Sequence, residues 1–555
     1  MSEDSKLILP RRFGRRQVII GAAGVGAAGV LAACSSDSSS SPATTGAPGT
    51  TAGGAETTAA PTGTDAPTTT AAATGKQGGT LRVGVVGSTN DIIDGQYIVA
   101  RADQARMVTG WEPIANYDDD FNIAYNHGLA EFIEAKAPDN YIVRLKSGIE
   151  FHNAKTMGAD DLIYSFNRLI DPAQGIAPAL GQFIDSNSFK KLDDLTVEIT
   201  LLKPSVAFLN GMADYGANIV PVGYTRDGEQ IGTGPYKLKS FTPGSESVHV
   251  RHENYWGQTY LDEVQIIDFS DQAALVNALV SGDIDVAIDV PYSQATTVSS
   301  NSDLVLLESA AGNWQTITMR VDMAPFDDVR VRQAMRLIVD REEMVQRVLS
   351  GHGRVGNDMY GVLDGSYPKE FPQRVQDIEA AKALLKEAGQ EGMEIELFAP
   401  DDTAGLAEYI TAFAEQAKEA GITVTPTVLD GGTYWGAEYT QRVFATSYWS
   451  TRPYLNQVPQ GALPDATYPE THWPPEGSDF VDLYNQAIAE VDTEKRYAII
   501  EQMQKEEYEE GGNIISYFQN LIDGHAAYVK GAVSRPNLLN FDHFGRGFQN
   551  IWLDV

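Results

Sequence analysis

The sequence predicts an α/β protein with at least two lobes. Its 555 residues are too many to share a single hydrophobic core. From residue 78 onward, short segments with apolar residues at every second position alternate with segments that repeat them every three or four positions. This alternation of strand and helix patterns is typical of a sheet covered by helices.

The chain is strongly acidic. Its 75 Asp and Glu residues outnumber 41 Lys and Arg residues, which gives a formal net charge of −34. Because affinity for a phosphate backbone depends on basic side chains, we do not expect nucleic acid as a partner. We interpret the acidic surface as a source of solubility.

Residues 1–33 are predicted to be a lipoprotein signal peptide. Arginines at 11, 12, 15 and 16 precede an apolar run at 18–33, which is shorter than the roughly 20 residues of a bilayer span. Residues 31–34 match a lipobox, so Cys34 is the predicted lipid attachment site. Residues 15–19 loosely resemble a twin-arginine export signal, and an uncleaved anchor remains an alternative. Either way, the body is expected outside the cytoplasmic membrane, in the periplasmic space or cell envelope.

Cys34 is the only cysteine, so disulfides and thiolate metal sites are excluded. Residues 34–77 consist mainly of Ser, Thr, Ala, Gly and Pro. Such a segment buries too little apolar surface to offset its ordering entropy, so we predict a disordered tether. An O-glycosylated stalk is the alternative.

The folded body is expected to begin at residue 78. The first part contains patterns for strands at 81–85, 141–145 and 197–201 and for helices at 100–108 and 157–169. Asp160 or Asp161 is a predicted N-cap or first-turn acid of the second helix.

Residues 232–257 predict a turn, a strand, a second turn and a second strand. Gly232 and Gly234 permit positive φ, and Pro235 fixes the φ angle that follows. Further along come a strand at 264–267, a helix at 273–280 closed by Gly282, and a strand at 283–287.

The segment 325–351 predicts two capped helices. Asp327 or Asp328 precedes the first helix, whose residues 331, 334, 335 and 338 form an apolar stripe. Residues 340–343 form a capping box for the second helix, which should end at Gly351. We interpret the arginines of 330–332 as structural, forming ion pairs at the lobe junction. The remaining patterns indicate helices at 380–388, 406–420, 479–490 and 494–509 and strands at 422–424, 443–449 and 514–518.

Two of these segments carry a family resemblance. The sequence GTGPYKL at 232–238, followed by NYWG at 254–257, resembles a signature of the peptide/nickel-type extracellular solute-binding proteins, family 5, which serve ABC importers. PFDDVRVRQA at 325–334 is similar to a second signature of that family. Weaker likenesses lie at 111–117, 147–152 and 283–287, and Asn153-Ala154 stands where the family usually has Asp-Gly. The resemblance extends over 78–555.

The resemblance implies a periplasmic-binding-protein-like fold: two α/β lobes that close about a hinge, with an extra subdomain in the first. Lobe I would comprise 78–117, 226–317 and 516–555, the inserted subdomain 118–225, and lobe II 318–515. The implied function is capture of a ligand between the lobes and transfer to an ABC permease with its ATPase, with the binding protein a monomer. No catalytic motif is present, and we expect no enzyme activity, cofactor or metal site. His249 and His252, three apart in a predicted strand, would point to opposite faces.

The candidate ligand-binding residues centre on Tyr448, Trp449, Thr451 and Arg452. In peptide-binding members, a Trp-x-x-Asp segment occupies this place, and its Asp pairs with the ligand's ammonium group. The resemblance therefore places Arg452 where an acid is usual. A guanidinium favours a carboxylate, phosphate or sulfonate, although Arg452 could instead be tied to a protein carboxylate. Weaker candidates, each as compatible with a core position, are Trp111, Asn313, Trp314, Tyr434 and Trp435.

These residues leave the ligand class open. A peptide-like ligand follows from the resemblance, and Arg452 makes a non-peptide anionic solute, such as an opine-like conjugate, a metal chelate or an oligosaccharide, the main alternative. An extracellular hydrolase and a binding protein that reports to a receptor without transport are the others.

Overall fold

The computed structural model describes residues 75–555 except 99, 119–120, 175, 177, 215, 536–540 and 542–545. The predicted signal peptide, Cys34 and the tether through residue 74 lie outside the described residues. Residues 75–77, predicted as the end of the tether, contact the folded body. Lys76 Nζ lies 2.7 Å from Asp554 Oδ1, and Gln77 Nε2 donates to the carbonyl oxygen of Thr259 at 3.1 Å. The ordered body therefore begins slightly earlier than predicted.

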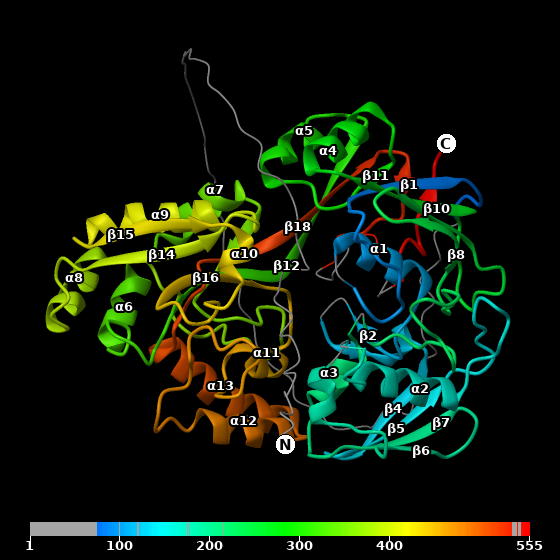
Figure 1. Cartoon of the computed structure of the whole chain (residues 1–555), viewed down its shortest axis with the longest axis horizontal. Coiled ribbons are helices and arrows are strands. Elements are labelled where there is room, and N and C mark those ends of the chain that lie inside the picture. The colour runs from blue at the N-terminus through cyan, green and yellow to red at the C-terminus, as the bar shows by residue number, and fades with distance from the viewer. Residues whose placement is uncertain are drawn as a thin grey trace, which may run out of the picture. The chain divides into compact units, whose positions relative to one another are not determined.

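A twelve-stranded mixed sheet runs through the described body (Figure 1). Its strands follow the order β15-β14-β16-β12-β18-β11-β1-β10-β9-β8, with β13 beside β18 and β17 beside β12. Their bounds are β1 Thr80–Val86, β8 Tyr236–Thr242, β9 Glu246–Arg251, β10 Glu263–Phe269, β11 Val286–Ala287, β12 Leu304–Met319, β13 Gly353–Val355, β14 Glu394–Pro400, β15 Thr423–Leu429, β16 Phe444–Trp449, β17 Asn513–Ile514 and β18 Tyr517–Ala526.

The β1 end of this sheet agrees with the sequence patterns. β1 pairs in parallel with β10 and β11, and its residues Leu81, Val83 and Val85 are buried. Helices α1 (Arg101–Gly110) and α4 (Gln272–Ser281) pack on this end. Gly282 ends α4 with a φ of 81°, which confirms the predicted closure.

A separate four-stranded sheet lies within 118–225, the predicted inserted subdomain. Its order is β4 (Ala130–Ala137), β5 (Asn140–Leu145), β7 (Thr196–Thr200) and β6 (Phe189–Lys191). Helix α2 (Ala159–Ile170) packs on it, with Gly158 as N-cap and Asp161 as a first-turn acid that accepts from Gly158 N at 3.0 Å. The neighbouring elements are β2 (Asn116–Tyr117), β3 (Ile123–Ala124), η1 (Tyr125–His127), η2 (Pro178–Gln182) and α3 (Phe208–Met212).

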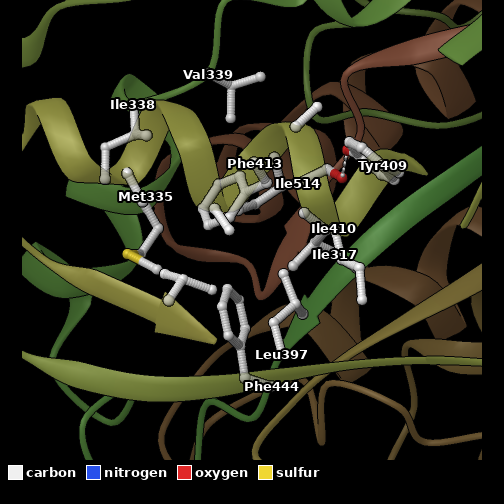
Figure 2. Packing of buried hydrophobic residues seen from close by; sticks show 14 of the residues in the cluster. Ile317, Met335, Ile338, Val339, Leu397, Tyr409, Ile410, Phe413, Phe444 and Ile514 are labelled. Carbon is white, nitrogen blue, oxygen red and sulfur yellow. Dashed lines mark hydrogen bonds between the residues drawn. The ribbon is translucent and has the colours of Figure 1, made fainter. Parts of the chain in front are cut away.

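The other end of the large sheet packs against helices α6 (Val329–Leu337), α7 (Arg341–Leu349), α8 (Ile378–Glu387) and α9 (Leu406–Glu419). Figure 2 shows Met335 and Ile338 beside Leu397, Phe413 and Phe444 in one apolar core. Asp328 caps α6, and Asp340 caps α7 by accepting from Glu343 N at 2.9 Å. The predicted stripe at 331, 334, 335 and 338 is fully buried, which confirms the helical spacing.

The remaining elements complete the chain. Helices α12 and α13 confirm the two long helices predicted near the C-terminal end. The bounds are η3 Tyr292–Gln294, α5 Ala295–Ser299, α10 Gly431–Tyr434, α11 Tyr454–Gly461, α12 Phe480–Ala489, α13 Thr493–Glu510, β19 Val529–Lys530 and β20 Trp552–Leu553.

Strands β12 and β18 join the two ends of the large sheet. Residues 304–309 of β12 pair with 521–526 of β18, whereas residues 314–319 of β12 pair with β16. The register shifts between Ser309 and Asn313. Figure 1 shows β12 and β18 running from the β14–β16 group toward β11 and β1. The predicted lobe boundary at 317/318 falls inside β12, close to this irregularity, and the boundaries themselves remain a prediction.

Residues of the signature at 232–257 converge on one buried carboxylate, Glu112. Glu112 is fully buried and accepts four hydrogen bonds, which come from Thr233 Oγ1 (2.9 Å), Tyr255 OH (2.9 Å), Trp256 Nε1 (3.1 Å) and Arg546 Nε (3.0 Å). A buried carboxylate is tolerated only with such donors. Thr233, Tyr255 and Trp256 of the signature at 232–257 therefore have a structural role.

The glycines of that signature are needed for a reason other than the predicted one. Neither Gly232 nor Gly234 has a positive φ. A Cβ on Gly232 would lie 2.0 Å from the carbonyl oxygen of Gly110, and one on Gly234 would lie 2.5 Å from the Gly110 carbonyl carbon. The close approach of two backbones excludes a side chain here.

The arginines of 330–332 are structural, but the prediction that they form ion pairs at the lobe junction is wrong. Arg330 pairs with Asp328, the N-cap of its own helix. Arg332 donates to the carbonyl oxygens of Phe326 and Glu510, at 2.6 and 2.8 Å. Arg336 likewise donates to the carbonyl oxygens of Tyr508, Gly511 and Asn513. These guanidinium groups satisfy carbonyls at the end of α13, where the helix dipole favours a cation.

Candidate ligand-binding site

The loop that carries Arg452 connects β16 to α11 and is fixed to the irregular part of β12. Thr451 donates from both its N and its Oγ1 to Asn313 Oδ1, at 2.9 and 3.0 Å. Gly312 N donates in turn to Thr451 Oγ1 at 3.0 Å. Two predicted site residues, Thr451 and Asn313, therefore hold each other and position the loop.

An aromatic stack lies behind this loop. The ring centroids of Trp449 and Trp314 are 6.0 Å apart, those of Trp314 and Tyr360 are 5.5 Å apart, and those of Tyr360 and Tyr454 are 5.2 Å apart. Trp449 Nε1 donates to Glu470 Oε2 at 3.2 Å. Trp449 and the weaker candidate Trp314, both predicted as ligand-binding residues, are thus largely buried members of this stack.

Arg452 has an unusual environment for a guanidinium. Its side chain is partly buried, and its Cζ lies 5.9 Å from the centroid of the Trp449 ring. Among the described residues, no carboxylate lies within 4 Å of it. The alternative of a direct ion pair between Arg452 and a protein carboxylate is therefore not observed among the described residues.

Three groups from elsewhere in the chain are connected electrostatically through Tyr117, which interacts with Asp214, Asp364 and Arg452. Tyr117, at the end of β2, donates from its hydroxyl to Asn210 Oδ1 at 3.3 Å. Burial raises the pKa of Tyr117, the carboxylates of Asp214 and Asp364 raise it further, and the Arg452 guanidinium opposes them. We refer to Tyr117, Asp214, Asp364 and Arg452 as the interlobe site.

The two acids of the interlobe site differ in their bonding. Asp214 is exposed, and its Oδ1 accepts from Gly216 N at 2.9 Å. The surrounding protein still desolvates this carboxylate and raises its pKa, an effect that the bond from Gly216 and the charge of Arg452 oppose. Asp364, by contrast, accepts from Tyr454 N at 2.8 Å and from both N and Oγ of Ser366.

Beside the interlobe site, α3 and the residues before it contact α11 and the end of α12. Asn210 Nδ2 donates to Asn456 Oδ1 at 2.9 Å, and Asn456 Nδ2 donates to the carbonyl oxygen of Ala207 at 3.2 Å. Val206 N donates to the carbonyl oxygen of Ile488 at 2.8 Å. These bonds bring the predicted inserted subdomain against the predicted second lobe.

The remaining predicted site residues lie in other cores. Trp111 is buried and donates from Nε1 to the carbonyl oxygen of Ile231 at 3.0 Å. Tyr434 donates to the carbonyl oxygen of Thr446 at 2.6 Å, and Trp435 Nε1 donates to Asp402 Oδ1 at 3.0 Å. Tyr448 is partly buried, with its ring against that of Trp435. Trp111, Tyr434 and Trp435 are therefore core residues, which was the alternative to a place in the ligand site.

Sequence reasoning missed Tyr117, Asp214 and Asp364. Each is an isolated polar residue in an irregular or short segment, and only the folded chain brings the three together. Among the residues that the structure describes, no group of His, Cys, Asp or Glu side chains has the arrangement of a metal site. Within that same part of the chain, every helix is too short or too polar to cross a bilayer.

The sequence of this body matches a known family. Residues 125–462 match the family model described as bacterial extracellular solute-binding proteins, family 5 Middle. Because the match covers more than half of the chain, the protein belongs to this family, as the signatures predicted.

Individual relatives agree with this assignment. Heme-binding protein A of Haemophilus influenzae is 30% identical over 278 residues, covering 45% of this chain and 51% of the relative. Glutathione-binding protein GsiB of Pectobacterium atrosepticum is 28% identical over 307 residues, covering 53% and 58%. The chain thus spans about half the length of the curated relatives it matches.

Solved structures show the fold. The periplasmic binding protein DppA of Helicobacter pylori, in complex with the peptide STSA, superimposes with a TM-score of 0.70 at 18% identity, covering 86% of this chain and 99% of that one. The predicted two-lobed periplasmic-binding-protein-like fold is therefore confirmed.

Proposed function

We propose that this protein is the lipid-anchored substrate-binding component of an ABC importer. It captures a peptide-like ligand at the interlobe site and delivers it to a permease and its ATPase. The observation that carries the proposal is Arg452, a partly buried cation beside Trp449 that has no carboxylate partner among the described residues. A guanidinium in that state is a ready partner for a ligand carboxylate.

Capture follows from contacts that the ligand makes on both sides of the interlobe site. A carboxylate binds Arg452, and the rest of the ligand lies against Tyr117 and the neighbouring Asn210. Because such a ligand stabilises the state in which α3 meets α11, binding shifts an open–closed equilibrium toward closure. The lipid on Cys34 keeps the monomeric protein near the permease.

A non-peptide anionic solute is the second candidate. It is favoured by the presence of Arg452 at a place where peptide-binding members of the family have an acid. The relatives' names include both kinds of ligand, since one is a glutathione-binding protein and another is a heme-binding protein.

Mass spectrometry of ligand released from gently purified full-length protein tests the proposal. A series of short peptides supports peptide import, whereas a single anionic non-peptide mass replaces it with the second candidate. If the protein is purified empty, a thermal-shift screen follows, in which a ligand at about 100 times its Kd should add roughly 2.7 kcal/mol. Turnover of the bound compound would contradict a pure binding role.

The role of Arg452 is tested with a matched pair of variants. We expect Arg452→Gln to weaken ligand binding by about tenfold or more, because a charged hydrogen bond is lost. Arg347→Gln on the exposed face of α7 removes the same charge far from the site and should leave binding unchanged. Equal affinity of the two variants would contradict a ligand contact at Arg452.

A further inference from the structure

We propose that Tyr292, Glu308, His352 and Asn520 form a hinge clasp, a set of contacts that stabilises the closed arrangement of the two lobes. Tyr292, Glu308 and Asn520 belong to predicted lobe I, and His352 belongs to predicted lobe II. The inference rests on the closure that the proposed function invokes, but it concerns positioning residues at the hinge, outside the interlobe site.

The first argument is the place of the clasp in the fold. Glu308 lies on β12 and Asn520 lies on β18, the two strands that join the ends of the large sheet (Figure 1). Glu308 directly precedes the segment from Ser309 to Asn313, where the pairing of these strands shifts register. Irregular positions of this kind absorb the backbone changes of a hinge motion. A rotation of the lobes should therefore act on the clasp.

The second argument is that the Glu308 carboxylate accepts a hydrogen bond from each of two segments. His352 Nδ1 donates to Glu308 Oε2 at 3.0 Å, and Asn520 Nδ2 donates to Glu308 Oε1 at 2.6 Å. Because a carboxylate only accepts, the pairing assigns a proton to His352 Nδ1. The side chains of His352 and Glu308 are only 22% and 33% exposed, so their bond is partly shielded from water. Such a bond contributes more than one between fully exposed groups.

The third argument is that Tyr292 connects the clasp to both ends of the sheet. Its ring stacks on that of His352, with centroids 6.1 Å apart and planes 12° apart, and its hydroxyl donates to the carbonyl oxygen of Asn520 at 2.9 Å. The ring also packs against the apolar core of α6–α9 and against a second core that contains Leu275 and Leu279 of α4. A rotation between the two ends of the sheet must therefore alter the packing of Tyr292.

The backbone around His352 holds its imidazole in place. Helix α7 ends in two consecutive left-handed residues, Ser350 with a φ of 52° and Gly351 with a φ of 89°. This conformation is unfavourable for a serine and persists where the surrounding structure fixes it. His352 N donates to the carbonyl oxygen of Leu349 at 2.9 Å, and its carbonyl oxygen accepts from Asn520 N at 3.3 Å. The imidazole is thus presented to the clasp with little freedom of the chain that carries it.

The clasp is formed in the same structure in which α3 and the residues before it contact α11 and α12. That contact includes the bond from Val206 N to the carbonyl oxygen of Ile488 at 2.8 Å and the Asn210–Asn456 bond. Both sets of contacts therefore belong to one arrangement of the chain. Loss of the clasp should shift the open–closed equilibrium toward opening, and the bond of Val206 N should then break more often.

Hydrogen–deuterium exchange of the full-length protein in detergent tests the clasp without any ligand. Exchange at Val206 N reports opening, and exchange at the amides of β14, which pair with β15 inside predicted lobe II, reports unfolding of the body. The test variants are His352→Asn, which removes the stack and the bond to Glu308, and Tyr292→Phe, which removes only the hydroxyl bond.

His472→Asn is the matched control. His472 Nδ1 lies 3.6 Å from Asp322 Oδ2, its side chain is 25% exposed, and both residues lie within predicted lobe II. Its backbone has a φ of 52°, a conformation that Asn tolerates better than most residues. The control therefore removes a comparable histidine–carboxylate contact by the same substitution at a place that lobe rotation does not alter.

We expect exchange at Val206 N to be about tenfold faster in His352→Asn, because a hydrogen bond to a charged group is lost. In Tyr292→Phe, which keeps the stack, the increase should be smaller, about threefold. The β14 amides should exchange as in the unmodified protein, and His472→Asn should leave Val206 N unchanged. This pattern separates opening from a general loss of stability, which would speed exchange at both places.

Three results would overturn the inference. Exchange at Val206 N could be unchanged in both test variants, it could increase equally in His472→Asn, or it could increase no more than exchange at the β14 amides. Each of them leaves ligand capture standing, because no ligand enters the experiment. Failure of the capture proposal is decided separately, by the mass spectrometry of released ligand.

Discussion

Two buried glutamates, Glu112 and Glu507, show how this protein uses the same side chain in different ways. Glu112 accepts four hydrogen bonds, one of them from the Arg546 guanidinium. Among the described residues, the side chain of Glu507 on α13 accepts only from the hydroxyls of Tyr360 and Tyr454, at 2.8 and 2.6 Å. Burial without a paired cation raises the pKa of Glu507 to about 7.

The difference separates a structural charge from a titratable one. The Glu112 carboxylate joins segments that are far apart in the sequence. Each of its oxygens already accepts two hydrogen bonds from the protein. Glu507 lies beside the end of the aromatic stack behind Arg452. A change in its protonation alters the hydrogen bond that it accepts from Tyr454. Arg336 is close to Glu507, but it donates to the backbone carbonyl and not to the carboxylate.

The largest effect is expected for Glu112→Gln. The substitution leaves Arg546 buried without its partner, so we expect a loss of about 3–5 kcal/mol in the free energy of unfolding, measured with urea. Glu507→Gln at pH 8 should be neutral or stabilising, because it removes a buried charge that lacks a cation. Similar losses in the two variants would show that the two sites do not differ as described.

The next effect is a dependence of stability on pH that comes from Glu507. Its folded pKa lies above the unfolded value, so its contribution is present below about pH 4.5 and is lost as the pH rises through about 7. The size of this change is about 3 kcal/mol. Comparing urea unfolding of the unmodified protein and Glu507→Gln at pH 5 and pH 8 measures it, and parallel pH curves would contradict it.

The region around Glu112 should respond to pH in the opposite direction through His152. Gly232 N donates to His152 Nδ1 at 3.2 Å, while Nε2 lies 3.1 Å from the carbonyl oxygen of Gly234. Burial, with a smaller contribution from His252, lowers the pKa of His152 to about 3. The folded state therefore binds fewer protons than the unfolded state between pH 6.5 and 3, and stability falls as the pH falls.

Between pH 6.5 and 5 we expect His152 to account for a loss of about 1–2 kcal/mol. His152→Gln keeps an amide that can hydrogen-bond but cannot titrate, so its urea midpoint should vary less over this range. If the slope of the variant equals that of the unmodified protein, the imidazole does not control it.

The smallest effect is expected for Tyr454→Phe and Tyr360→Phe. Each removes one hydroxyl donor to Glu507 and should cost about 1 kcal/mol at pH 8, where the carboxylate is charged. At pH 5, where Glu507 is protonated, the cost should shrink. Thermal unfolding at the two pH values measures the difference, and a pH-independent cost would assign the loss to packing.

The sequence could predict features that depend on neighbouring residues. The apolar stripe of α6 and its Asp328 cap are local, and both are present. The reason for Gly232 could not be predicted, because the atom that excludes its side chain belongs to Gly110, far away in the sequence. The partners of Arg332 were also mispredicted. They are backbone carbonyl oxygens, and a pattern of side chains does not indicate which carbonyls lack a partner.

The candidate site divides in the same way. Arg452 could be found because a motif surrounds it and because its charge departs from the family pattern. Asp214 has no such surroundings, Tyr117 only ends the weak likeness at 111–117, and the relation of both to Arg452 exists only after three distant segments fold together. Trp111 and Tyr434 show the reverse problem, because large aromatic residues fit a core as well as a binding site and local sequence does not separate the two.

The stacked indoles beside Arg452 give the protein a built-in optical signal. Trp449 and Trp314 lie within the same stack, and the Arg452 guanidinium is over the Trp449 ring. Emission from an indole depends on nearby charge, so a carboxylate that binds the guanidinium should change the intensity or colour of the light from these two residues. Ligand capture could then be followed in real time by tryptophan fluorescence, without attaching a dye.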